Sequence, residues 1–196
     1  MRVIAGTYRS RILKSPRDLA LRPTSDMLRE TLFNVLSPRI PDSRFVDAFA
    51  GTGAVGLEAL SRGASEVIFI EVHGPTVGLI KKNLEMLEVR SGTRILTMDA
   101  LRGLQRLASE FQAGSAPIDI VFLDPPYAAA EDYRKVLSFL GDANFLVEGS
   151  LVVAEHRHTF GLPETFAELR RVRVLRQGDA SLSFYRFGPS PGAEEK

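Results

Sequence analysis

From residue 44 to residue 155 the sequence alternates between short strand patterns and longer helical patterns. The strand patterns are runs of β-branched and aromatic residues, and amphipathic stretches separate most of them. Consecutive parallel strands need a crossover connection, usually a helix, so this alternation is typical of a parallel sheet. The expected strands are 45–49, 66–71, 93–98, 118–123 and 150–155.

Two further strand patterns, 169–175 and 181–187, flank the turn Gln177-Gly178-Asp179 and predict an antiparallel hairpin. The sequence therefore predicts an α/β fold with a doubly wound, mainly parallel seven-stranded sheet, helices on both faces and a C-terminal antiparallel hairpin. Right-handed crossovers leave few topologies for such a sheet. Its ligands are expected beyond the carboxyl ends of the strands.

A small extension precedes this sheet. Residues 2–12 alternate loosely around Gly6, which predicts two short strands or a β-hairpin, and an amphipathic helix is expected to follow. We expect three regions in the chain, namely a basic N-terminal arm over 1–22, the main domain over 23–187 and a disordered tail over 188–196.

A glycine-rich turn follows the first expected strand. Gly51 and Gly53 permit a tight turn and close approach of the backbone to a ligand, and Gly56 allows the next helix to pack closely on the sheet. Glu71 lies at the end of the next expected strand, where a carboxylate binds two ribose hydroxyls. This pattern predicts a nucleoside cofactor, and by itself it fits a nicotinamide dinucleotide as well as S-adenosylmethionine (SAM).

Two acidic residues favour SAM. Asp47 precedes the glycines on the same strand, where it would repel a pyrophosphate and attract the cationic amino-acid end of SAM. Asp99, after the third strand, is placed to accept a hydrogen bond from the adenine amino group, although it also fits a helix N-cap. The residues expected to form the cofactor site are Asp47, Phe49, Ala50, Gly51, Thr52, Gly53, Glu71, Val72, Asp99, Ala100 and Asp124.

The expected strand 118–123 ends in Asp124-Pro125-Pro126-Tyr127. Two prolines stop the strand and stiffen the loop, because each fixes φ and lacks an N–H. As a hypothesis, the Asp124 carboxylate and the Pro125 carbonyl accept the two hydrogens of an exocyclic amine, while Tyr127 stacks on its base. These four residues are the candidate catalytic group, and nicotinamide chemistry has no need of such a loop.

Basic residues concentrate at the N-terminus. Residues 1–22 hold six arginines and lysines against Asp18 alone, although the whole chain carries a net charge of only +1. A basic arm favours a polyanionic partner, and a solvated charged face explains it equally well. The side chains expected to contact RNA are Arg2, Tyr8, Arg9, Arg11, Lys14, Arg22 and Arg29.

Several classes of function find no support. The chain contains no cysteine, and it has no apolar run of membrane-spanning length and no apolar signal segment after Met1. We therefore expect a cytoplasmic protein. His156 and His158 have no third ligand at suitable spacing, so no metal site is predicted and both histidines are expected in surface or loop positions.

Four segments resemble the RsmD family of bacterial methyltransferases: residues 2–6, 21–36, 49–63 and 124–127. The resemblance covers about residues 1–187, with His73 standing where the family often has an aspartate. It implies a Rossmann-like SAM-dependent methyltransferase fold and methylation of guanine N2 in 16S rRNA, within an assembled or assembling small ribosomal subunit. The compact organisation favours a monomer.

Three other functions remain open at this point. An adenine-N6 methyltransferase acting on DNA or RNA would share the chemistry of the Asp-Pro-Pro-Tyr loop. A nicotinamide oxidoreductase would share the glycine-rich turn. A non-catalytic rRNA-binding assembly factor would keep the basic arm and the fold.

Overall fold

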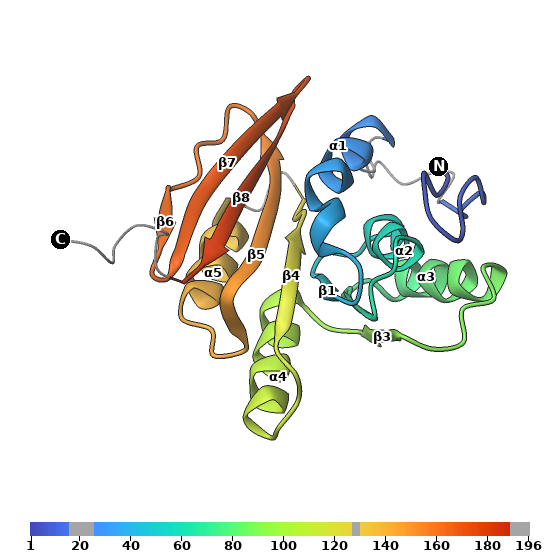
Figure 1. Cartoon of the computed structure of the whole chain (residues 1–196), viewed down its shortest axis with the longest axis horizontal. Helices are drawn as coiled ribbons and strands as arrows, with labels where there is room; N and C mark the ends of the chain where they lie inside the picture. Colours follow the sequence, from blue (N-terminus) through green and yellow to red (C-terminus); the bar gives the residue numbers. More distant parts are fainter. Residues whose placement is uncertain (16–25, 127–129, 189–196) are drawn as a thin grey trace. The chain divides into compact units, whose positions relative to one another are not determined.

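A computed structural model of the chain describes residues 1–15, 26–126 and 130–188 (Figure 1). These residues fall into two compact units, Met1–Ala100 and Leu101–Lys196, which we describe separately. The described part of the N-terminal arm, residues 1–15, belongs to the first unit. The expected C-terminal tail lies outside the described residues except for Gly188.

The first unit has three parallel strands in the order β3-β2-β1, as the alternating pattern predicts. In register, Asp47 of β1 lies opposite Phe69 of β2, and Ile70 of β2 lies opposite Leu96 of β3. The elements of this unit are α1 (Asp26–Leu36), the 3-10 helix η1 (Ser37–Arg39), β1 (Arg44–Asp47), α2 (Ala54–Ser61), β2 (Glu66–Ile70), α3 (Gly74–Met86) and β3 (Thr93–Leu96).

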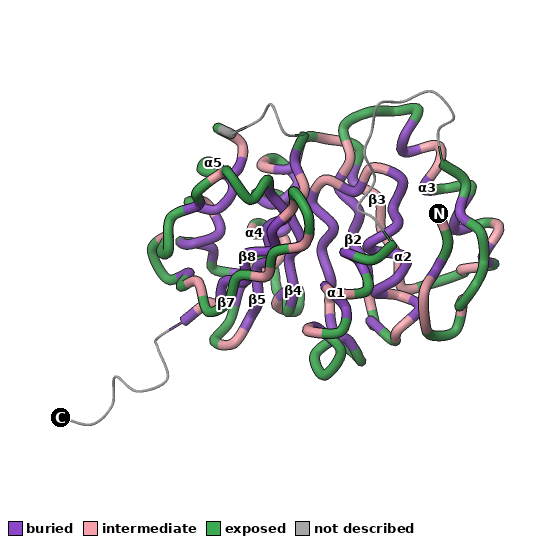
Figure 2. The backbone as a smooth tube through the Cα atoms, turned by 90° about the horizontal axis from the view of Figure 1, so that it is seen from above, coloured by how far each residue is buried: buried purple, intermediate pink, exposed green. Residues whose placement is uncertain are grey.

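Strand β2 is buried on both of its faces, as expected for a central parallel strand (Figure 2). Helix α2 packs on β1 and β2, and the helix can approach because Gly56 has no side chain. A Cβ at Gly56 would lie 2.4 Å from Cε1 of Phe69 and 2.8 Å from Cγ1 of Val67. The packing role predicted for Gly56 is therefore confirmed.

The N-terminal arm is less regular than the predicted hairpin. A single antiparallel bridge joins Arg2 to Ile12, and the loop between them turns at Gly6 and Ser10, which both have positive φ. The loop also lies against the C-terminal end of α2. There the Thr7 and Tyr8 N–H groups donate to the backbone oxygen and the Oγ of Ser61, at 2.8 and 2.9 Å. The two sides of the arm are also joined by backbone hydrogen bonds, from Val3 N–H to the Arg11 oxygen at 3.0 Å and from Leu13 N–H to the Met1 oxygen at 3.1 Å. The arm therefore pairs with itself, as predicted, and is bound to α2 as well.

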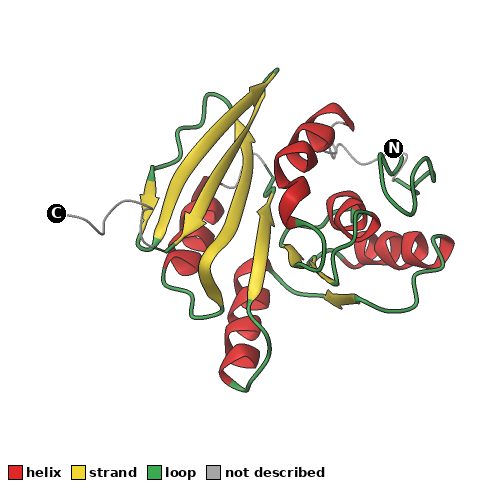
Figure 3. Cartoon of the chain, viewed as in Figure 1, coloured by secondary structure: helices red, strands yellow, loops and turns green. Residues whose placement is uncertain are grey.

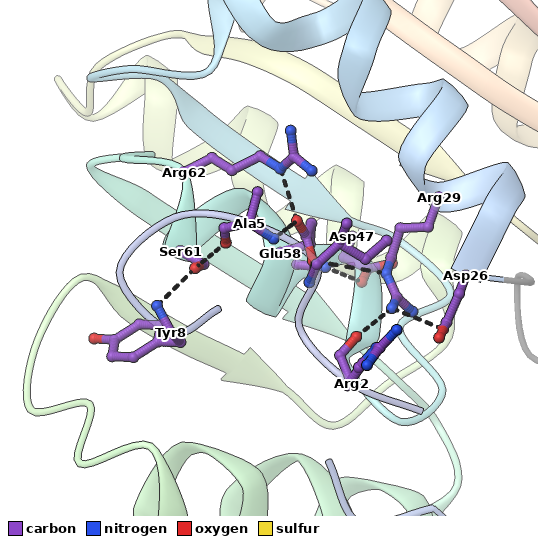
Figure 4. A network of polar contacts seen from close by, with 11 residues as sticks. Arg2, Ala5, Tyr8, Asp26, Arg29, Asp47, Glu58, Ser61 and Arg62 are labelled. Carbon is purple, nitrogen blue, oxygen red and sulfur yellow. Dashed lines mark hydrogen bonds and ion pairs between the residues drawn. The ribbon is translucent and has the colours of Figure 1, made fainter. Parts of the chain in front are cut away.

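A buried carboxylate, that of Glu58 on α2, fastens the arm (Figure 4). It accepts hydrogen bonds from the N–H groups of Ile4 at 2.7 Å and Ala5 at 3.0 Å, and from Nε of Arg62 at 2.7 Å. The guanidinium of Arg29 lies 3.8 Å away, and both the Glu58 and the Arg29 side chains are 0% exposed. The network thus joins the arm, α1 and α2 through buried charges.

Arg29 was expected to contact RNA, and its burial excludes that role. Its guanidinium donates to Asp26 Oδ1 and to the backbone oxygen of Arg2. The reason is its position on α1, because Arg29 shares the helix face of Leu32, Phe33 and Leu36, which are all buried. An arginine on the apolar stripe of a helix is buried, so its hydrogen-bond acceptors must also lie in the protein interior.

The second unit combines parallel and antiparallel strands in the order β4-β5-β8-β7-β6 (Figure 3). Strands β4 and β5 are parallel, and the remaining pairs are antiparallel, including the predicted C-terminal hairpin β7–β8. Helix α4 begins at the unit boundary and precedes β4. The elements are α4 (Ala100–Gln112), β4 (Ile118–Leu123), α5 (Ala130–Gly141), β5 (Leu146–Arg157), β6 (Thr165–Phe166), β7 (Leu169–Gln177) and β8 (Ala180–Phe187).

The described residues thus contain eight strands, against the seven predicted. The additional strand is β6, whose two residues are too few for any periodic pattern. Strand β5 begins at Leu146, before the predicted start at residue 150, and runs through Gly149, which has a φ of 88°. None of the described helices is long and apolar enough to cross a membrane. The α/β class is as predicted.

We predict that Glu58→Ala lowers the free energy of unfolding by about 3–5 kcal/mol, because it removes the buried charge beside Arg29 and the acceptor of the Ile4 and Ala5 N–H groups. Urea denaturation measures the change. Glu85→Ala, which removes an exposed carboxylate from α3, is the matched control and should change stability by less than about 0.5 kcal/mol. Equal effects of the two variants would contradict the role of the buried network.

Candidate functional site

The turn between β1 and α2 is built from glycines with left-handed backbone conformations. Gly51 has a φ of 52° and Gly53 a φ of 79°, values that side-chain-bearing residues rarely adopt. The Gly53 N–H donates to the Ala50 oxygen at 2.7 Å, which closes the turn, and the Gly53 oxygen accepts from Leu57 at the start of α2. The turn therefore places backbone N–H groups at the N-terminus of a helix, as the sequence predicts.

Glu71 holds this turn from the end of β2. Its Oε2 accepts the Gly51 N–H at 2.9 Å, and its Oε1 accepts the His73 N–H at 2.8 Å. The side chain is half-buried. Each carboxylate oxygen can accept a further hydrogen bond, so Glu71 can hold the turn and still accept from ligand hydroxyls.

Asp47 supports the same turn from the end of β1. Its Oδ2 accepts the Gly56 N–H at 2.9 Å, and the residue is only 2% exposed. Burial raises the pKa of Asp47 to about 7 from an ordinary 3.8; the Gly56 hydrogen bond opposes this shift, and the negative charge of Glu71 adds to it. A cation bound beside these two carboxylates would relieve that repulsion and favour the ionised form of Asp47.

The other predicted cofactor residues lie around the turn or follow the neighbouring strands. The Val72 side chain, next to Glu71, is 66% exposed, so it offers an apolar surface beside that carboxylate. Asp99 is exposed and follows β3, whose carboxyl end lies beside that of β2, as the hydrogen bond from Glu71 N to the Leu96 oxygen shows. Phe49 is half-buried, while Ala50, Thr52 and Ala100 are buried.

His73 stands where the resemblance described above leads us to expect an aspartate. Its ring Nδ1 lies 2.8 Å from Oγ1 of Thr76 in the first turn of α3, and its backbone N–H is the one bound by Glu71. The hydrogen bonds of His73 thus fix the segment that follows β2. The imidazole itself is exposed.

The second unit carries the candidate catalytic group that begins at Asp124. Asp124 and Pro125 follow β4 directly; Asp124 is partly exposed, Pro125 is buried and Pro126 is exposed. In register, Leu123 lies opposite Ala154 of β5, so Asp124 follows the end of β4 next to Glu155, which lies within β5. Tyr127 lies outside the described residues. An acid at the carboxyl end of a buried strand, followed by two prolines, agrees with the predicted placement.

The predicted RNA-contacting residues of the arm differ in their surroundings. Arg2, Arg9, Arg11 and Lys14 are exposed, and Tyr8 is half-buried. Arg11 also has a structural contact, because its Nη2 donates to the Met86 oxygen at the end of α3, at 3.0 Å. The remaining arginine of this group, at position 22, lies outside the described residues.

The two histidines of the 156–158 segment have different surroundings. His156 is buried, contrary to the expected surface position, and its Nε2 lies 2.9 Å from Oγ of Ser183. Burial lowers the pKa of the His156 imidazole. Within residues 1–15, 26–126 and 130–188, no group of three histidine, cysteine, aspartate or glutamate residues is arranged to hold a metal ion.

Sequence reasoning missed three buried polar residues, Glu58, Ser61 and Asn83. Glu58 and Ser61 bind backbone groups of the arm, and Asn83 binds both the arm and the turn. Asn83 is fully buried on α3 and donates to the Thr52 oxygen in the turn. A signal was available, because Asn83 interrupts the apolar stripe of Ile80, Leu84 and Leu87. A polar residue on such a stripe indicates a buried hydrogen-bond partner.

Comparison with known proteins gives concordant matches along nearly the whole chain. Residues 1–186 match the family described as Conserved hypothetical protein 95. The chain is 37% identical over 179 residues to ribosomal RNA small subunit methyltransferase D of Escherichia coli (strain K12), covering 90% of this chain and 86% of that protein. It is 34% identical over 186 residues to YlbH of Bacillus subtilis, covering 95% and 98%.

A solved structure, that of the yhhF protein of Escherichia coli, also has the same fold. It superimposes with a TM-score of 0.82 at 32% sequence identity, and the match covers 96% of this chain and 98% of that one.

We predict that Asp47→Asn removes a pH-dependent cost to stability. The folded state binds the Asp47 proton more tightly than the unfolded chain, so Asp47 lowers wild-type stability progressively as pH rises from about 4 to about 7. An asparagine can still accept the Gly56 N–H but carries no charge. At about pH 8 the variant should therefore be more stable than the wild type, by up to about 4 kcal/mol.

Urea denaturation at about pH 5 and about pH 8 provides the measurement. Asp42→Asn is the matched control, since Asp42 is exposed and its backbone, with a φ of 62°, suits asparagine. If Asp47→Asn and the control had the same dependence of stability on pH, the raised pKa of Asp47 would be wrong.

Proposed function

Because the chain belongs to the Conserved hypothetical protein 95 family, together with ribosomal RNA small subunit methyltransferase D, we propose that it transfers a methyl group from SAM to the exocyclic N2 of a guanine in 16S rRNA. The observation that carries this proposal is the pair of carboxylates, Asp47 and Glu71, that hold the glycine-rich turn. The name of the Escherichia coli relative suggests ribosomal RNA as the substrate. The loop after β4 offers the Asp124 carboxylate and the Pro125 carbonyl, which suit an amino group as the methyl acceptor.

The surroundings of the turn favour SAM over a dinucleotide. A pyrophosphate needs positive charge and free N–H groups at a helix N-terminus. Here Asp47 and Glu71 take up the Gly56 and Gly51 N–H groups and make the turn negative. That charge suits the ammonium group of SAM. In this proposal Glu71 also accepts from the ribose hydroxyls, Val72 contacts the adenine ring and Asp99 accepts from the adenine amino group.

The acceptor is an exocyclic amine whose lone pair is delocalised into the guanine ring. Asp124 and the Pro125 carbonyl accept its two hydrogens, which draws the nitrogen towards a tetrahedral arrangement and frees the lone pair. The nitrogen then attacks the methyl carbon, the carbon–sulfur bond breaks, and its electron pair leaves with S-adenosylhomocysteine (SAH). Positioning of this kind supplies about 7–11 kcal/mol of the reduction in barrier.

The charge that develops during transfer explains the need for a carboxylate. Positive charge grows on the acceptor nitrogen as the bond to the methyl forms, and the Asp124 carboxylate stabilises it. The methylated ammonium then loses a proton to solvent, so no strong general base is needed. Tyr127 stacks on the flipped base, for about 1–3 kcal/mol.

The arm provides the RNA contacts in this proposal. Arg2, Arg9 and Lys14 are exposed on a segment that α2 and α3 hold by hydrogen bonds. Phosphate contacts from such side chains position an RNA without reading its sequence. A guanine that enters an amine-binding loop must be unstacked, which favours a loop or bulge of the rRNA as the target.

Transfer of labelled methyl from SAM tests this function directly. The acceptors are undermethylated small ribosomal subunits, naked 16S rRNA and DNA, and nucleoside analysis identifies the product. We expect N2-methylguanosine from subunits or rRNA. Label recovered only as N6-methyladenine would show that adenine, and not guanine N2, is the methyl acceptor. Binding of SAM without methyl transfer to any of the three acceptors would favour a non-catalytic binding protein.

We predict that Asp124→Ala lowers the turnover number about 100-fold or more, because the amine loses its charged acceptor. Affinity for SAH should fall far less than turnover does, because the glycine-rich turn keeps its own groups. Single-turnover methyl transfer and calorimetry measure the two quantities. Asp119→Ala, an exposed position on the same strand β4, is the control and should retain activity. Near-normal turnover by Asp124→Ala would remove this residue from the mechanism.

We predict that Arg9→Gln weakens rRNA binding and reduces the salt dependence of its affinity by about one unit of log–log slope. Affinity for SAH should not change. Arg90→Gln, an exposed arginine between α3 and β3, is the matched control for loss of one positive charge. An identical effect of both variants on the slope would mean that the arm has no special role in RNA binding.

A further inference from the structure

Asn83 occupies an unusual position for an amide. It lies on α3 with 0% of its side chain exposed, among the apolar residues that pack this helix on the unit. Burying an amide without hydrogen-bond partners is unfavourable, so the hydrogen bonds of Asn83 must offset that penalty. Among the described residues, the side-chain hydrogen bonds of Asn83 go to backbone groups outside α3.

Two of the bonds bind the end of the arm. The Lys14 N–H donates to Oδ1 of Asn83 at 2.7 Å, and Nδ2 of Asn83 donates to the Lys14 oxygen at 3.1 Å. The amide therefore pairs with Lys14 as a neighbouring strand would, satisfying both its N–H and its carbonyl. This fixes the position of the arm where its described part ends.

The third bond reaches the glycine-rich turn. Nδ2 of Asn83 also donates to the Thr52 oxygen at 3.2 Å. Thr52 stands between Gly51 and Gly53, so its carbonyl belongs to the peptide that carries the Gly53 N–H. The two amide hydrogens of Asn83 are thus divided between the arm and the turn.

The arm and the turn share a second connection. The other end of the arm is bound by Glu58 and Ser61 of α2, the helix whose N-terminus is formed by the turn. Both anchors of the arm therefore lie on elements that border the turn. A shift of the arm that is strong enough to move Lys14 has a direct hydrogen-bonded route to Thr52.

We propose that Asn83 is a positioning residue that couples the basic arm to the glycine-rich turn, so that binding of RNA on the arm changes the affinity of the turn for SAM. This rests on the proposed function, because it takes the arm as the RNA contact and the turn as the cofactor site. A buried apolar residue at position 83 would pack α3 equally well but would transmit nothing between the two segments.

Coupling of this kind is reciprocal. If RNA raises the affinity for SAM by some factor, SAM raises the affinity for RNA by the same factor. We expect a factor of about five or more in the wild type, at the lower end of typical allosteric coupling. RNA binding would then favour loading of the cofactor, and the loaded protein would bind its substrate more tightly.

Calorimetric titration of SAH, with and without saturating 16S rRNA, measures this factor. In Asn83→Ala the coupling factor should fall close to one, and affinity for SAH alone should fall several-fold because the Thr52 carbonyl loses its donor. Lys82→Ala, an exposed neighbour on the same helix, is the control and should keep the wild-type factor.

A second pair of variants leaves the buried helix intact, in case Asn83→Ala does not fold. Lys14→Pro and Lys14→Gln both remove the lysine charge, but only proline removes the N–H that donates to Asn83. The coupling factor should fall further in Lys14→Pro than in Lys14→Gln.

Three results would overturn the inference: a coupling factor of one in the wild type, an unchanged factor in Asn83→Ala, or equal factors in the two Lys14 variants. Failure of the proposed function would look different, because the wild type would then bind no SAH or transfer no methyl group to RNA.

Discussion

Two carboxylates that accept backbone N–H groups hold together the part of the first unit where the strands end. Glycines at 51 and 53 give the chain a tight turn, but glycine brings no side chain to fix that turn in place. Asp47 and Glu71 supply the fixing groups from the ends of adjacent parallel strands, each by a hydrogen bond of 2.9 Å. Because both groups are acidic, the same contacts that order the turn also give it a charge that selects for a cationic ligand.

The cost of this arrangement is visible in Asp47. Its carboxylate is buried beside a second acid, so the ionised form is disfavoured in the absence of a cation, and the pKa is raised to about 7. Functional sites often retain such strain, because it is relieved only when the right ligand binds. The arm is held in a comparable way, since Glu58 and Asn83 are buried polar groups that bind, among other partners, backbone groups of the arm.

How much the sequence predicts depends on whether the signal is local. Strand β4 is predicted at its observed bounds because its apolar run is ended by two prolines, and the glycine-rich turn is recognisable because left-handed backbone needs glycine. The arm pairs with itself, as its local pattern predicts, but its hydrogen bonds to Ser61, more than fifty residues away, have no local signal. Arg29 and Asn83 show the same limit: each lies on an apolar helix stripe, and only the tertiary structure shows which partners make its burial tolerable.

The central claim is that the carboxylate-held turn binds the cationic end of SAM. Calorimetric titration of SAH, which carries the same ammonium group, at about pH 6, 7 and 8 in buffers of different ionisation enthalpy tests it most directly. Asp47 should lose its proton as the ammonium binds, so affinity should rise with pH across this range and protons should be released near pH 7. Absence of binding, or binding without pH dependence or proton release, would contradict the account.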